Sequence, residues 1–244
     1  MTGQVTSPGL ARWIPDEWRA FGAFLRRPAL PERMTGIRPA ALASVLKLFA
    51  LDAVLMAIML GLVGVASAAG VKFPSNEIDS LSLSPLILAL IVLAAPIGEE
   101  LVFRGWLSGR PGPVVAAVAL LVGVLVPVVS GPQGHPILLF GSLAMAVLVA
   151  VGVLIWLRKR LAFPFFSRHF AWFYFAASLL FALAHLTNYS SGAALILLPL
   201  VIPQLLVGLI LGYARVTFGL WSDLLLHMLH NGVLISLIVL QKGL

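Results

Sequence analysis

The stretch "SPLILALIVLAAPIGEELVFRGWL", Ser84 to Leu107, decides what kind of fold this chain can have. As a helix rising about 1.5 Å per residue, this apolar run is long enough to cross the roughly 30 Å hydrocarbon core of a bilayer. The same run holds Glu99, Glu100 and Arg104. An ionisable side chain at that depth costs about 2.5 to 3.5 kcal/mol, so each of the three needs a partner or a function.

The composition of the whole chain supports a membrane protein. Its 244 residues are 61% hydrophobic and 10% charged, with a mean hydropathy of +1.06, and soluble domains are only roughly 45 to 50% apolar. The chain has no cysteine, which excludes thiol nucleophiles, disulfides and cysteine-bound zinc. The net charge of +7 comes from Lys and Arg near the ends of apolar segments. This pattern is typical of contact with anionic lipid headgroups rather than with nucleic acid.

Hydropathy predicts an all-α fold, a polytopic transmembrane helical bundle of about seven spans. The spans are expected at residues 45–66, 84–108, 113–130, 136–157, 168–186, 194–213 and 219–240. Residues 1–40 are basic and aromatic, and predict an amphipathic arm that lies on the membrane surface. No cleavable signal peptide is expected, because this charged arm precedes the first apolar run. Residues 41–244 are expected to form one transmembrane domain.

The distribution of positive charge predicts the orientation. Most Lys and Arg, including Arg104 and Arg215, fall at the ends of spans on the side that also carries residues 1–40. Only Lys72 and Lys242 are expected on the other side. Because Lys and Arg stay in the cytoplasm, we expect a multi-pass protein of the cell membrane with its N-terminus in the cytoplasm and its C-terminus outside.

The two adjacent glutamates of the opening stretch have different surroundings. Glu100 and Arg104 are four residues apart and share a helix face, which predicts an ion pair with a purely structural explanation. Glu99 points about 100° away around the helix, and its own span offers it no cation. We therefore expect Glu99 either to be protonated or to meet polar groups from other helices.

Two other predicted spans carry histidines at a similar depth. "FALAH" places His185 four residues after Phe181, and "HMLHN" places His227 four residues before Asn231. Counting the helix rise from the span ends puts these polar groups and Glu99 in the middle of the bilayer, where they could converge on one water-accessible cavity. The alternative for each histidine is an interhelical hydrogen bond without catalysis.

Other polar residues stay outside this predicted cluster. His230 is expected to face a neighbouring helix or lipid, and Asp52 has no predicted partner. Asp223 lies four residues before a histidine that it could orient, but its place in the first turn of the last helix favours a capping role. His135 and His169 flank loops and are expected to be solvated.

Familiar intramembrane protease chemistries narrow the choice. No histidine is followed by glutamate, which excludes a His-Glu-x-x-His zinc site. Asp52 is the only aspartate well placed at depth, so an aspartyl pair is missing, and so is a Gly-x-Ser-x-Gly turn. A site made of glutamate and histidine remains.

"EELVFR", "FALAH" and "HMLHN" occur in this order, each in an apolar segment. Together they resemble the Glu-Glu-x-x-x-Arg, Phe-x-x-x-His and His-x-x-x-Asn/Asp motifs of the CPBP family, which contains type II CAAX prenyl endopeptidases and bacterial Abi proteins. The resemblance covers about residues 84–240. The chain differs from the family in the distance from Arg104 to His185, where two extra spans form an insertion at about 113–157. Two added crossings preserve the direction of the motif helices.

The resemblance implies an intramembrane endopeptidase that hydrolyses peptide bonds of membrane-associated peptides or proteins. It implies that Glu99 activates water with the help of His185, and that His227 and Asn231 donate hydrogen bonds to the oxyanion. The two remaining motif residues, Glu100 and Arg104, would then fix the helix and its electric field.

Cofactor and function class stay partly open. Glu99, His185 and His227 could hold zinc or another divalent metal, or work without one. The expected partners are the lipid bilayer and a peptide substrate, and nothing in the loops indicates a prenyl group. The other classes are a non-catalytic scaffold or bacteriocin-immunity-type protein of the same fold, and a proton-coupled transporter. A transporter would be expected to have matching broken helices in two halves, which the sequence does not display.

Overall fold

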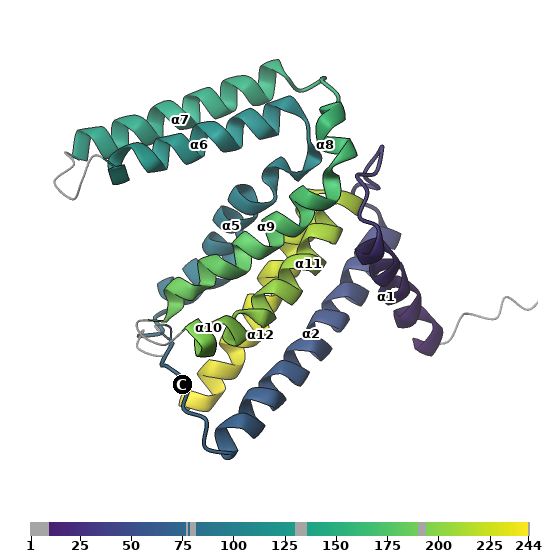
Figure 1. Cartoon of the computed structure of the whole chain (residues 1–244), viewed down its shortest axis with the longest axis vertical. Coiled ribbons are helices and arrows are strands. Elements are labelled where there is room, and N and C mark those ends of the chain that lie inside the picture. The colour runs from purple at the N-terminus through teal and green to yellow at the C-terminus, as the bar shows by residue number, and fades with distance from the viewer. Residues whose placement is uncertain (1–9, 77, 79–81, 130–135, 190–193, 244) are drawn as a thin grey trace, which may run out of the picture.

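The computed structural model describes residues 10–76, 78, 82–129, 136–189 and 194–243. Within these ranges every regular element is a helix, which confirms the predicted all-α class (Figure 1). An isolated antiparallel bridge joins Asn76 to Tyr189. The elements, with π-helical and 3₁₀ segments marked η, are α1 (Leu10–Arg26), α2 (Pro39–Ala68), α4 (Pro85–Ala89), η1 (Leu90–Ala94), α5 (Ala95–Phe103), η2 (Gly105–Ser108), α6 (Pro111–Val129), α7 (Pro136–Trp156), α8 (Pro164–Arg168), α9 (Phe170–Ala184), η3 (His185–Asn188), α10 (Ala194–Leu200), α11 (Ile202–Thr217) and α12 (Leu220–Lys242).

Four helical segments of the described ranges are long and apolar enough to cross a membrane. They are Pro39–Ala68, Pro85–Phe103, Phe170–Asn188 and Leu220–Lys242. Shorter apolar helices cover Pro111–Gly123, Phe140–Trp156 and Ile202–Thr217. The structure therefore supports a multi-pass membrane protein, but the predicted number of about seven spans is not confirmed.

Two predicted spans have different limits in the structure. The span expected at 194–213 is divided into α10 and α11 at Val201, because Pro199 lies inside α10 and Pro203 opens α11. The span expected at 84–108 ends as an α-helix at Phe103, and a 3₁₀ turn follows. The prolines explain why the first of these spans is divided, and the change from α-helix to a 3₁₀ turn shortens the second.

The N-terminal helix α1 packs on the bundle through its aromatic face. Trp18 Nε1 donates a hydrogen bond to the carbonyl of Lys47 in α2 at 2.9 Å. The ring of Phe24 lies 5.0 Å from that of Tyr213 and 5.1 Å from that of Tyr174, between centroids. Trp18 and Phe24, two of the aromatic residues that predicted contact with the membrane surface, therefore pack against α2, α9 and α11.

Helix α11 is central to the bundle, with α9, α12 and α2 packed around it (Figure 1). Gly208 and Gly212 face α9. A Cβ at Gly212 would lie 2.8 Å from the ring of Tyr174, and one at Gly208 would lie 3.3 Å from the ring of Phe181. Small residues four apart let two membrane helices approach closely, so these glycines set how near α9 comes to α11.

Helices α6 and α7 form a hairpin that packs chiefly on itself, joins the bundle near η2 and diverges from it along its length (Figure 1). It coincides with the insertion expected at about 113–157. Its two ends meet, because the N–H of Phe163 donates to the carbonyl of Gly109 at 2.9 Å. Gly109 has a φ of +63° and lies where a Cβ would overlap the ring of Phe166, so glycine is required at this corner.

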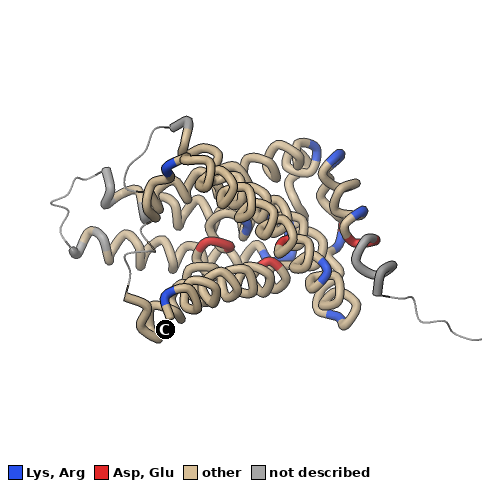
Figure 2. Tube along the Cα trace, turned by 90° about the horizontal axis from the view of Figure 1, so that it is seen from below, with Lys and Arg blue, Asp and Glu red and all other residues tan. Residues whose placement is uncertain are grey.

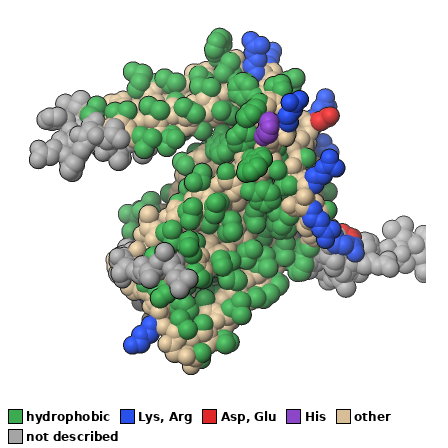
Figure 3. Space-filling model, viewed as in Figure 1, with side chains coloured by type: hydrophobic (Ala, Val, Ile, Leu, Met, Phe, Trp, Pro, Cys, Tyr) green, Lys and Arg blue, Asp and Glu red, His purple; other side chains and the backbone are tan. Residues whose placement is uncertain are grey.

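Most Lys and Arg gather at one end of the bundle (Figure 2), and the face drawn in Figure 3 is otherwise largely apolar. Arg104 and Arg215 are exceptions, with exposed fractions of 0% and 6%. The charge pattern counted both among the positive charges at span ends, which does not reveal their burial. Both are interior side chains.

Candidate active site

A π-helical turn interrupts the helix that carries the glutamates. Pro96 has no N–H, and the N–H of Ala95 bonds to the carbonyl of Leu90, five residues back. The carbonyl of Ile91 is therefore left without a donor from its own helix, and it accepts a hydrogen bond from Asn231 Nδ2 at 2.9 Å. Such turns occur often at functional sites, and here the turn ties the glutamate helix to α12.

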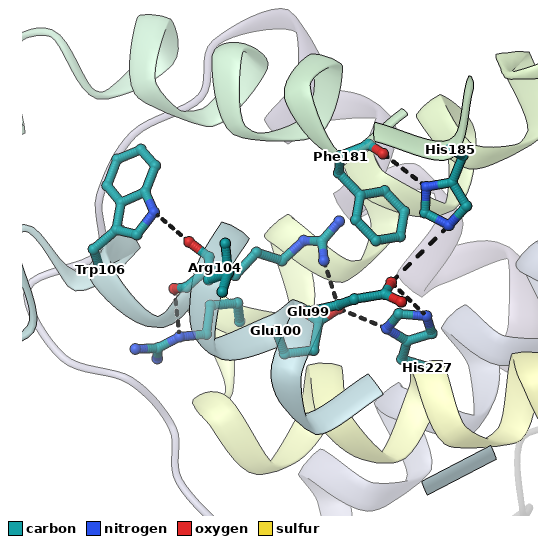
Figure 4. A network of polar contacts seen from close by, with 9 residues as sticks. Glu99, Glu100, Arg104, Trp106, Phe181, His185 and His227 are labelled. Carbon is teal, nitrogen blue, oxygen red and sulfur yellow. Dashed lines mark hydrogen bonds and ion pairs between the residues drawn. The ribbon is translucent and has the colours of Figure 1, made fainter. Parts of the chain in front are cut away.

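Glu100 is a buried acceptor for two donors. Its Oε1 accepts from Arg104 Nη1 at 2.5 Å and from His227 Nδ1 at 2.7 Å (Figure 4). The ion pair predicted between Glu100 and Arg104 is confirmed. Because a carboxylate only accepts hydrogen bonds, His227 carries its proton on Nδ1, and its Nε2 is directed elsewhere.

Phe181 gives the Phe-x-x-x-His spacing two physical functions. Its carbonyl accepts a hydrogen bond from His185 Nδ1 at 2.8 Å, just beyond the end of α9. Its ring lies 4.2 Å from the guanidinium carbon of Arg104, and it meets the His227 ring edge to face at 5.7 Å. A cation over an aromatic face is stabilised by the ring quadrupole, so one residue orients His185 and also covers Arg104.

Glu99 lies between the two histidines (Figure 4). Its Oε2 is 3.7 Å from His227 Nε2 and 4.0 Å from His185 Nε2. The Glu99 side chain is 31% exposed, whereas that of Glu100 is fully buried. No described residue gives Glu99 Oε2 a hydrogen bond. The prediction that Glu99 meets groups from other helices is confirmed.

The donor types around Glu99 are those that zinc prefers. Each histidine donates from Nδ1 to an oxygen and directs Nε2 inward, which is the usual arrangement of a zinc-binding histidine and its hydrogen-bond partner. A divalent cation bound there would supply Lewis-acid polarisation of a carbonyl. Across the described ranges, however, no group of three or more His, Asp or Glu side chains is arranged to hold a metal ion. We therefore derive the chemistry from the side chains themselves.

A second carboxyl group lies next to Glu100. Asp223 is fully buried, and its carboxyl group lies close enough to Glu100 and Arg215 for their charges to interact. Among the described residues, no hydrogen-bond partner is present for either oxygen of Asp223 or for Glu100 Oε2. Asp223 does lie in the first turn of α12, where the helix dipole favours a carboxylate, but this helix has no side-chain cap hydrogen bond.

Arg215 closes the end of the glutamate helix. Its Nε donates to the carbonyl of Arg104 at 3.1 Å, and its Nη2 donates to that of Gly105 at 3.0 Å. The last carbonyls of a helix need such donors. The arginine in the last turn of α11 thus holds α5 in place.

His230 and Asp52, left unassigned by the sequence, form a pair. His230 Nδ1 lies 2.7 Å from Asp52 Oδ2, joining α12 to α2. No spacing rule predicts this contact between residues so far apart in the chain. Of the two histidines expected to be solvated, His169 makes an exposed contact with the carbonyl of Phe165. His135 lies outside the described residues.

The structure thus brings together all six predicted site residues from three parts of the chain. Glu99, Glu100 and His227 form the centre, and the carbonyl of Phe181 orients His185 toward it. Asn231 reaches the same helix through a backbone carbonyl. The sixth residue, Arg104, pairs with Glu100.

A family model agrees with this arrangement. The model described as "Type II CAAX prenyl endopeptidase Rce1-like" matches residues 81–233, more than half of the chain. The comparison with curated proteins gives no match, and neither does the comparison with solved structures. The matched segment contains all three motifs, whereas α1 and α2 lie before it. The chain therefore belongs to the Rce1-like family of type II CAAX prenyl endopeptidases.

Proposed function

We propose that this protein is an intramembrane endopeptidase that cleaves membrane-associated peptides with a water molecule activated by Glu99. The observation that supports this most directly is the position of one partly exposed carboxylate between the Nε2 atoms of His185 and His227. Two atoms 4.0 Å apart can both lie about 2.8 Å from one water oxygen.

In the proposed reaction Glu99 is the general base. It takes a proton from water as the water oxygen attacks the carbonyl carbon of the peptide bond. His185 donates from Nδ1 to Phe181, so its Nε2 carries a lone pair that accepts the other hydrogen of this water and orients it.

The oxyanion of the tetrahedral intermediate needs donors. Asn231 uses one Nδ2 hydrogen on Ile91 and has a second one to offer. His227 donates from Nε2 as the imidazolium, whose charge is balanced by Glu100 at Nδ1. A donor of this kind contributes about 3 to 4 kcal/mol in other hydrolases. Glu100 and Arg104 are positioning residues in this scheme.

The proposed substrate is a peptide held at the membrane. The family description suggests a prenylated C-terminal CAAX tail as the first probe, and the same peptide without the prenyl group is its control. The clustering of Lys and Arg at one end of the bundle supports a cytoplasmic position for that end, and so for α1 (Figures 2 and 3).

Cleavage by the purified protein tests the proposal. We expect Glu99→Gln to lower kcat/KM for quenched fluorescent peptides, with and without a prenyl group, by about 10² to 10⁴-fold, the usual contribution of a general base. Glu32→Gln, at an exposed position, is the matched control and should leave the rate unchanged. Wild-type activity should persist with a chelator.

Full activity of Glu99→Gln would contradict the proposed base. A wild type that cleaves no peptide, together with a cellular effect that survives Glu99→Ala, would favour a scaffold or immunity protein instead.

A further inference from the structure

Asp52 and His230 form a buried acid–base pair that the proposed mechanism does not use. The exposed fraction of Asp52 is 1% and that of His230 is 9%. Their short contact, Nδ1 to Oδ2 at 2.7 Å, joins α2 to α12. Asp52 lies outside the segment that the family model matches.

This pair lies beside the site. His230 is three residues after His227 on α12, and their ring centroids are 6.5 Å apart. His230 is also close enough to His185 for their charges to interact. The titratable groups facing His230 are therefore Asp52 from α2, His185 from η3 and His227 from its own helix.

The hydrogen bond to Asp52 prepares His230 to give up a proton. Asp52 accepts from Nδ1, which fixes the orientation of the ring and leaves Nε2 as the nitrogen that can donate to a substrate. Nothing in the described ranges bonds His230 Nε2, and 10% of the side chain remains exposed. His227, in contrast, is already directed to Glu100 and Glu99 by its two nitrogens.

Amide hydrolysis needs such a donor. When the tetrahedral intermediate collapses, the C–N bond breaks and the departing nitrogen must receive a proton, because an amide anion is a very poor leaving group. Glu99 and His185 are engaged with the attacking water in the proposed mechanism, on which this inference rests.

We propose that His230, positioned by Asp52, is the general acid that protonates the leaving amine. The C–N electron pair goes to nitrogen, which takes the proton from His230 Nε2. The proton that Glu99 removed from water returns to His230, directly or through water. The cycle then consumes one water and leaves no net proton on the protein.

The test compares two scissile bonds in one peptide sequence. The probes are the peptide that wild type cleaves best and its analogue with a thioester at the same bond, whose thiolate leaves without prior protonation. We expect His230→Gln to lower kcat for the amide about 10²-fold and to leave thioester hydrolysis nearly unchanged. Asp52→Asn should also lower kcat for the amide and spare thioester hydrolysis, with a smaller decrease than His230→Gln causes. Because this variant keeps the imidazole, it can be used if His230→Gln does not fold. Glu99→Gln should abolish both reactions.

Each result is decisive. Equal losses on amide and thioester in folded variants would show that the pair only holds α2 against α12, and would overturn the inference. Unchanged amide cleavage by His230→Gln, with Glu99→Gln inactive, would overturn it while the proposed function stands. A wild type that hydrolyses neither probe would overturn the proposed function and this inference with it.

Discussion

At the scale of single residues, the site is a set of buried charges in which each carboxylate has a different task. Glu100 pairs with Arg104 and His227, Asp223 is buried close to Glu100, and Glu99 is the one of these three carboxyl groups that is partly exposed. Burying a charge in apolar surroundings is tolerated only when it is paired and hydrogen-bonded. The network around Glu100 therefore stabilises the charges and leaves Glu99 available for chemistry.

The second buried carboxyl group beside Glu100 leads to a prediction for Glu100→Gln. Breaking a buried ion pair usually costs about 3 to 5 kcal/mol. We expect a smaller loss of unfolding free energy here, because Asp223, an electrostatic neighbour of Arg104, can supply the negative charge that Arg104 loses. Glu100→Gln combined with Asp223→Asn should cost more than the sum of the single changes.

The free energy of unfolding in mixed micelles is measured for the wild type, the two single variants and the double variant. A double-mutant cycle of these four values gives the coupling between Glu100 and Asp223. Additive costs would show that Asp223 does not act as the second carboxylate of Arg104.

The sequence predicted which residues form the candidate site better than it predicted the contacts that these residues make with other helices. The spacing of four between Glu100 and Arg104 was sufficient, because both lie on one helix. The contact of His230 with Asp52 and that of Asp223 with Glu100 depend on how separate helices are rotated against one another. Local periodicity in a sequence does not contain that rotation.

At the scale of elements, the π-helical turn sets the direction of the two glutamates. A π turn accommodates one residue more than an α turn, and one residue corresponds to about 100° of rotation. The turn lies before both glutamates, so it rotates α5 as a unit and thereby sets whether Glu99 faces His185 and His227.

Pro96→Ala tests this arrangement. The new N–H lets the segment return to α-helical pairing, and the rotation should displace Glu99 from the histidines. We expect kcat/KM for the peptide probe to fall at least about tenfold with unchanged helix content by circular dichroism.

Pro85→Ala is the matched control. It makes the same substitution at the first position of α4, where a missing N–H costs nothing. Equal activity of both variants would mean that the π turn is not required.

Element limits were predicted well only where apolar runs are unbroken. The helix class and the existence of α2, α9 and α12 followed from hydropathy. The division at Val201 and the end of α5 at Phe103 did not, because a hydropathy window averages over prolines and over the hydrogen bonds that end a helix.

At the scale of the whole molecule, the hairpin α6–α7 is an appendage to a complete site. Among the described residues, none of the site contacts involves it, and its ends are joined by the hydrogen bond from Phe163 to Gly109. The chain therefore returns to the bundle at the corner where it left.

We therefore expect that residues 110–162 can be replaced by a short Gly-Ser joint. The shortened protein should insert, fold and retain cleavage that depends on Glu99, with a rate within an order of magnitude of the full chain. Cleavage of the peptide probe by the purified variant, with Glu99→Gln in the same background, measures this. Complete loss of activity in a folded variant would show that the hairpin contributes to substrate access.

The bond between Asn231 and Ile91 also has a consequence for biosynthesis. A carbonyl near the start of the acid-bearing helix finds its donor 140 residues later. Because a chain is made from its N-terminus, this hydrogen bond forms only after α12 has been synthesised. Assembly of the candidate site therefore ends with the last helix.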